Sequence, residues 1–74
     1  MILRLSVVIE KDKDGYYAYC PALAGCQTQG GSAEEVEHNI REAISLYLST
    51  LSEAERQELL NQEIKTTVME IQVA

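Results

Sequence analysis

Basic residues, cysteine, histidine and long apolar runs are all scarce in this chain of 74 residues. Lysine and arginine number 6 against 12 aspartates and glutamates, which gives a formal net charge of -6 at pH 7. Nucleic-acid binding needs clustered Lys and Arg to neutralise phosphates, and here they are scattered. The composition therefore argues against direct DNA or RNA binding. It fits either a basic protein partner or an acidic surface that only keeps the protein soluble.

The chain has two cysteines and one histidine. A zinc site needs about four ligands, and His38 falls on a different predicted element from Cys20 and Cys26. We expect both cysteines to be small core residues with reduced thiols, and His38 to lie on an exposed helix face. No metal and no cofactor are expected.

No apolar run approaches the roughly 20 residues needed to span a bilayer. Arg4 and Ser6 interrupt the apolar N-terminus, where a signal peptide would need a continuous core. We therefore expect a cytoplasmic protein with no membrane segment. Residues 1–74 are expected to form one domain, and because its core is small we expect a homodimer or tetramer.

Three strands are expected in the first half of the chain. Alternating residues predict a first strand over residues 2–10. A polar loop then ends in Gly15, which suits a hairpin, and strands over residues 16–20 and 26–29 follow. The apolar residues of the first strand share one face: Leu3, Leu5, Val7 and Ile9.

A long amphipathic helix is expected from about residue 33 to residue 50. Ser32 and Glu35 have the spacing of a capping box at its start. Its apolar residues recur at three- and four-residue steps and form one stripe: Val36, Ile40, Ala43, Ile44, Tyr47, Leu48 and Leu51.

Ser52 and Glu55 repeat the capping pattern, which predicts a break after the long helix and a short second helix over residues 54–61. Residues 66–73 alternate again and predict a fourth strand. The fold class is therefore α+β, with a three-stranded antiparallel meander, one helix layer and a fourth strand. A right-handed crossover would place the fourth strand parallel to the first, in the sheet order 3-2-1-4.

Residues 15–35 contain an ordered set of features: a tyrosine-rich strand, Pro-x-Leu-x-Gly-Cys, Thr-x-Gly, and a capped helix that opens with acidic residues. The residues concerned are Tyr16, Tyr17, Tyr19, Pro21, Leu23, Gly25, Cys26, Thr28, Gly30, Ser32, Glu34 and Glu35. In this order and spacing the segment resembles the HicB antitoxin family. The resemblance covers the first half of the chain well. It implies a degenerate ribonuclease H fold with the same sheet order.

The resemblance also implies an antitoxin-type binding module. Members of the family sequester HicA, a small basic toxin that cleaves mRNA, by covering its RNA-binding surface. Antitoxins that repress their own operon carry a C-terminal DNA-binding domain, and this chain ends at Ala74 without one, so no direct DNA binding is expected. Two alternatives remain open: a solitary self-associating domain with no toxin partner, and a residual nucleic-acid or small-ligand binder.

Enzyme activity is not expected. Ribonuclease H enzymes hold two metal ions with several acidic residues, and the first predicted strand carries Glu10 as its one acid. Asp12 and Asp14 fall in a turn, where backbone geometry favours them. His38 has no pattern of nucleophile and orienting group around it, which general-base catalysis requires.

Two groups of residues are candidates for a protein interface. Tyr17 and Tyr19 are expected on the sheet face away from the helix, and exposed apolar patches usually mark interfaces. Stacked aromatics can also bind RNA bases, but that needs surrounding positive charge, which here comes from Arg4 alone. The acidic candidates are expected to meet the basic surface of a HicA-like toxin: Asp12, Asp14, Glu34, Glu37 and Glu42.

Overall fold

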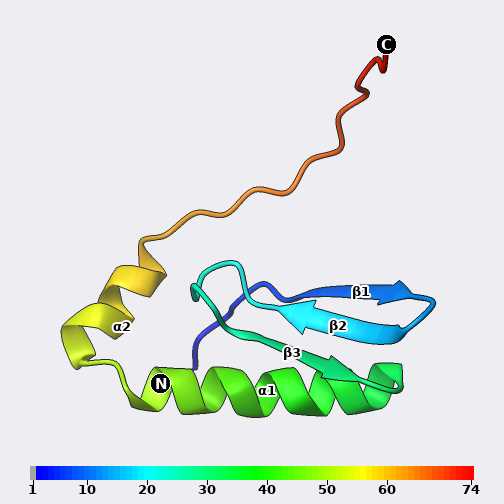
Figure 1. The fold of residues 1–74 in the computed structure, drawn as a ribbon. Coiled ribbons are helices and arrows are strands. Elements are labelled where there is room, and N and C mark those ends of the chain that lie inside the picture. Colours follow the sequence, from blue (N-terminus) through cyan, green and yellow to red (C-terminus); the bar gives the residue numbers. More distant parts are fainter. Residues whose placement is uncertain (1) are drawn as a thin grey trace.

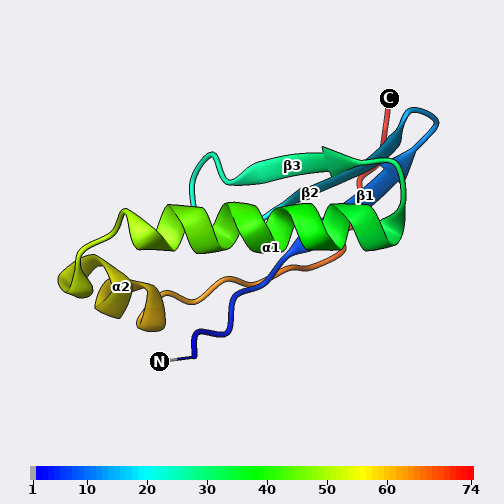
Figure 2. The ribbon, with the colours of Figure 1, turned by 90° about the horizontal axis from the view of Figure 1, so that it is seen from below.

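A computed structural model describes residues 2–74 (Figure 1). These residues form the strands β1 (Val8–Asp12), β2 (Gly15–Tyr19) and β3 (Gln27–Gly30) and the helices α1 (Ala33–Ser49) and α2 (Glu53–Leu60). The strands form an antiparallel sheet in the order β1-β2-β3. Helix α1 lies along one face of this sheet (Figure 1 and Figure 2). The predicted α+β class, with a three-stranded antiparallel meander, is confirmed.

The hairpin between β1 and β2 forms where the Asp-Gly sequence predicts it. Asp12 pairs with Gly15 across the turn, and Gly15 has a φ of 132°, which side chains disfavour. The backbone N–H of Asp14 donates to Oδ1 of Asp12 at 2.8 Å. This Asx-type bond explains why aspartates suit the turn.

The loop between β2 and β3 is closed by backbone hydrogen bonds. Leu23 N–H donates to the carbonyl of Cys20, Cys26 N–H to that of Leu23, and Cys20 N–H to that of Cys26, each at 3.0 Å. The loop therefore turns both cysteines and Leu23 into the core, where all three are buried. Both cysteines are free thiols, as expected for small core residues.

Helix α1 packs against β2 and β3 through the predicted apolar stripe. Val36 and Ile40 are buried, and Ala43, Ile44, Tyr47 and Leu48 pack against the core from its edge. The fully buried core is correspondingly small: Ala18, Cys20, Leu23, Cys26, Val36 and Ile40.

Both helices begin at the predicted serines, and the predicted break between them is confirmed. Ser52 and Glu55 form a complete capping box, with Glu55 N–H donating to Ser52 Oγ and Ser52 N–H donating to Glu55 Oε1. The box at α1 differs from the prediction. Ser32 Oγ accepts from Glu35 N–H at 3.1 Å, but the Glu35 carboxylate accepts from Gly31 N–H, one residue earlier than a capping box requires.

The first strand is shorter than predicted at its start. Residues 2–7 form no strand, and β1 begins at Val8. Val8 pairs with Tyr19, the last residue of β2. Beyond Tyr19 the chain turns into the loop at Pro21, so residues 2–7 have no neighbouring strand with which to form hydrogen bonds.

The predicted fourth strand is not formed. Residues 62–74 have no regular secondary structure and run away from the sheet as an extended segment (Figure 1). The sheet of the described residues therefore has the order β1-β2-β3, without the fourth member of the predicted 3-2-1-4 order. Alternation in residues 66–73 favours a strand, but a strand also needs a partner, and here none lies beside it.

Candidate protein interface

The sheet face opposite α1 carries Tyr17 and Tyr19, which alternate with the buried Ala18. Residues directly opposite one another on paired strands project to the same face. The register therefore groups the tyrosines with their neighbours on β1 and β3. We term this surface the tyrosine face: Val8, Glu10, Tyr17, Tyr19, Gln27 and Gln29.

The two tyrosines form a tilted aromatic pair, with ring centroids 5.8 Å apart. The hydroxyl of Tyr17 donates to Oε1 of Gln27 at 2.7 Å, across β2 and β3. Both side chains are half-buried. The pair is thus held in place before any partner binds, and it offers apolar area at a low cost in side-chain entropy.

A shallow hollow of about 240 Å³ adjoins the tyrosines at the loop between β2 and β3. Its walls combine Tyr17 and Tyr19 with Pro21, Leu23 and Ala24. Gln27 also lines it, and the exposed lining is about as polar as it is apolar, so the hollow suits a partner side chain with both apolar and polar parts.

A second hollow, of about 510 Å³, opens where the β1–β2 hairpin meets the start of α1. Asp12, Asp14 and Glu35 line it together with Tyr17, and among the described residues no lysine or arginine does so. Lys13 lies between the two aspartates in the turn but outside this lining. Tyr17 therefore lies between the hollow at the loop between β2 and β3, at one end of the tyrosine face, and an acidic hollow at the other end.

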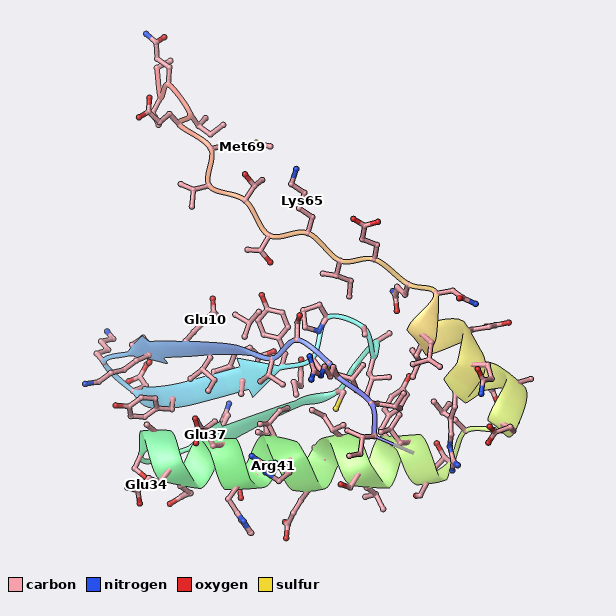
Figure 3. The ribbon with its side chains drawn as sticks, turned by 180° about the vertical axis from the view of Figure 1, so that it is seen from behind. Glu10, Glu34, Glu37, Arg41, Lys65 and Met69 are labelled. Atoms are coloured by element: carbon pink, nitrogen blue, oxygen red, sulfur yellow. The ribbon has the colours of Figure 1, made fainter. Side chains whose placement is uncertain are left out.

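The acidic candidates on α1 lie in the other layer of the fold. Glu37 lines a groove together with Arg41, and both are labelled with Glu34 in Figure 3. Oε1 of Glu42 lies 3.3 Å from Nε2 of His38, with both side chains exposed. The structure thus places Asp12 and Asp14 beside Tyr17, but it leaves Glu37 and Glu42 in two other surroundings.

Two carboxylates near the tyrosines were absent from the interface predicted from sequence. Glu10 stands directly opposite Tyr17 in the register. Alternate residues of a strand share one face, so the sequence spacing already places Glu10 on the same face as Val8. The sequence pattern around Glu35 indicates only a helix cap. Its approach to the hairpin aspartates depends on how α1 packs on the sheet, which no local pattern records.

The carboxylates do not form a metal site. Across residues 2–74, no three His, Cys, Asp or Glu side chains are grouped so that they could hold a metal ion. Neither α1 nor α2, the helices found in that same range, is long and apolar enough to cross a membrane.

Comparison with known proteins gives a family match and several relatives. The model of a family described as "HicB_like antitoxin of bacterial toxin-antitoxin system" matches residues 5–73. A UPF0150 protein of Helicobacter pylori is 55% identical over 47 residues, which cover 64% of this chain and 65% of that protein. A UPF0150 protein of Synechocystis is 49% identical over 51 residues, which cover 68% of this chain and 65% of that protein.

A UPF0150 protein of Archaeoglobus fulgidus is 40% identical over 63 residues, covering 84% of this chain and 91% of the relative. The matched part of this chain thus spans just under two thirds of the Helicobacter and Synechocystis relatives and most of the archaeal one. No solved structure is significantly similar to the chain.

Proposed function

Because the chain belongs to the family of HicB-like antitoxins, we propose that it is a protein-binding module that sequesters a small basic HicA-type mRNA interferase. The resemblance first seen in residues 15–35 extends over residues 5–73. The observation that carries the proposal is the position of Tyr17, which borders both the hollow at the loop between β2 and β3 and the acidic hollow.

The chemistry of this surface complements a protein that binds RNA. Such a toxin holds phosphates with lysine and arginine, and the carboxylates of Asp12, Asp14 and Glu35 offer those side chains the opposite charge. Exposed ion pairs are each worth under about 1 kcal/mol. The affinity therefore rests on Tyr17 and Tyr19 as apolar anchors, while the acidic residues mainly raise the association rate.

The same charges disfavour the nucleic-acid alternative. An aromatic platform for RNA needs cations around it, yet Tyr17 has Glu10 opposite it on β1 and the acidic hollow beside it. Arg4 lies in residues 2–7, outside the tyrosine face. RNA phosphates would therefore be repelled by this surface.

The first experiment pairs the chain with a small basic HicA-type protein encoded in an adjacent reading frame. Co-expression of the chain should relieve the growth arrest caused by that protein, and the two purified proteins should form a complex. If the chain neither relieves the growth arrest nor binds the protein, the proposal is contradicted. That result would favour a solitary self-associating domain. Binding of RNA in place of the protein would favour the residual nucleic-acid binder.

The second experiment maps the interface by surface-plasmon kinetics at two salt concentrations. Tyr17→Ala should speed dissociation by about 10-fold or more, because an aromatic anchor is lost. The double variant Asp12→Asn with Asp14→Lys should slow association and make the association rate less dependent on salt. Asparagine is chosen at position 12 because its side-chain oxygen can still accept the hydrogen bond from the backbone N–H of residue 14.

The matched control reverses the acidic residues of α1, Glu34, Glu37 and Glu42, to lysine. These residues act on a toxin through the long-range field alone, so their reversal should slow association and leave dissociation unchanged. An association rate that changes neither with salt nor with either set of substitutions would show that the acidic surface only keeps the protein soluble.

A further inference from the structure

β1 is an edge strand, and an apolar groove lies beside it. The groove has a volume of about 460 Å³ and separates α1 from the N-terminal part of the chain. Val7 and Ile9 remain 37% and 41% exposed there. The apolar lining comes from both sides: Leu3, Leu5, Val7, Ile9, Ile40, Ile44 and Leu48. Glu37, Arg41 and Ser45 line the same groove on the side of α1. The edge thus offers unpaired backbone groups next to an uncovered apolar surface.

A second unpartnered element lies at the other end of the chain. Val68, Met69, Ile71 and Val73 are 94%, 73%, 75% and 86% exposed. Residues 63–74 take part in no hydrogen bond with any other described residue. They run clear of the sheet, as the course of the chain in Figure 1 and the position of Met69 in Figure 3 show. Such an extended apolar segment is a template for strand pairing.

We propose that residues 64–73 of one copy add a strand to the β1 edge of a second copy and fill its groove. The exchange is reciprocal, so it gives a dimer with two-fold symmetry. Each copy would then carry the fourth strand that its own sheet lacks, supplied by the partner. This inference goes beyond the proposed function, because it needs no toxin and leaves the tyrosine face free.

The two elements match in length and in pattern. At about 3.3 Å per residue, residues 64–73 extend over about 33 Å, long enough to run beside β1 and the preceding residues 2–7, which form no strand in a single copy. Alternation directs Met69, Ile71 and Val73 to one side, toward the groove, and Glu70 and Gln72 to the other. Backbone hydrogen bonds would supply affinity, and the apolar side chains would supply the register.

The course of the chain favours a second copy over the segment's own sheet. Helix α2 is fixed to α1 by Arg56, whose Nε and Nη2 donate to the carbonyl of Leu48 at 3.2 and 3.1 Å. From α2 the segment departs on the side of the sheet away from α1 (Figure 1). For residues 64–73 to pair with β1 of the same copy, the chain would have to change direction after Asn61. Pairing with β1 of a second copy is possible with the direction that the chain has in Figure 1.

The test uses the full chain and isotope-filtered NMR. Labelled and unlabelled copies are mixed, unfolded and refolded together, so that filtered spectra report contacts between copies alone. We expect contacts between the methyl groups of Ile71 or Val73 in one copy and Leu5 or Val7 in the other. The same contacts found only within one copy would overturn the exchange, and so would their complete absence.

Sedimentation equilibrium gives an independent measurement. Ile71→Asp should raise the dimer dissociation constant at least about 100-fold, since each dimer loses two buried isoleucines. The matched control is Gln72→Lys, on the opposite side of the segment, which should leave dimerisation unchanged. Because Ile71 is outside the core of a single copy, circular dichroism should show the Asp variant folded. A dimer that survives Ile71→Asp but is lost with Tyr17→Ala would place self-association on the tyrosine face and overturn the proposal.

Discussion

Gly30, the last residue of β3, lies directly against Val36 of α1. A Cβ atom at Gly30 would come within 2.7 Å of the backbone nitrogen of Val36 and 2.9 Å of its Cα. Val36 is fully buried, so a shift of its backbone would disturb the packing of the core. The absence of a side chain at Gly30 therefore sets how closely the helix approaches the sheet, and with it the distance from Glu35 to the hairpin aspartates.

Gly30→Ala should lower the free energy of unfolding by about 1–3 kcal/mol, as overpacking in a filled core does. Urea denaturation followed by circular dichroism measures the change. Gly31→Ala is the matched control, because the nearest atom to its Cβ is Oε2 of Glu35 at 3.9 Å, an ordinary contact. Equal stability of the two variants would show that the backbone of α1 can shift at no cost.

Ile40→Val should lower the free energy of unfolding by about 0.5–1.5 kcal/mol, because Ile40 is 3% exposed and its lost methylene leaves a void. Leu46→Ala removes more carbon from the same helix but at a site that is 71% exposed. That variant should change stability by less than about 0.5 kcal/mol. The reverse ranking in thermal or urea denaturation would place α1 with a different face toward the sheet.

The pKa of Glu55 is lowered, first by its hydrogen bond with the backbone of Ser52 and second by that with the Ser52 side chain. A folded-state pKa below the unfolded value stabilises the fold at higher pH. That contribution is lost as the pH falls from the ordinary value of 4.5 through the lower folded value.

Carboxyl chemical shifts measured over pH 2–6 should therefore show Glu55 titrating below its ordinary value, and Ser52→Ala should raise its pKa. Glu55→Gln keeps an acceptor for the cap but removes the titrating charge. Below the ordinary pKa of 4.5, the stability of α2 should therefore vary less with pH in this variant than in the unmodified protein. An unchanged titration in Ser52→Ala would show that the Ser52 side chain contributes nothing and would leave the backbone N–H of residue 52 as the cause.

The pKa of the Cys26 thiol is raised, mainly because burial disfavours the thiolate and further because Cys20 lies nearby. Both cysteines are also buried, so their reaction with a thiol reagent at pH 8 should be slow in the native protein and fast in urea. The rate of reaction in increasing urea should follow the unfolding transition. Rapid labelling under native conditions would show that the loop between β2 and β3 opens on its own.

The amino-acid sequence by itself determined the local elements. Ser32 and Ser52 mark the helix starts because a side-chain oxygen can accept a backbone N–H that the first turn leaves free. Gly15 marks the hairpin because its φ of 132° excludes most side chains. Alternation around Ala18 was sufficient to set Tyr17 and Tyr19 on one face, and the spacing of residues 15–35 was sufficient to indicate the family.

Only the tertiary structure decided which of these elements lie next to one another. Residues 2–7 and 66–73 carry strand patterns yet form no strand, because a strand exists only where a second one accepts its hydrogen bonds. The acidic hollow is lined by residues of different elements, Asp12 and Asp14 from the hairpin and Glu35 from α1, which come together where α1 packs on the sheet. Periodicity describes one element at a time, whereas the distance between residues on different elements depends on how closely the side chains between them allow those elements to pack.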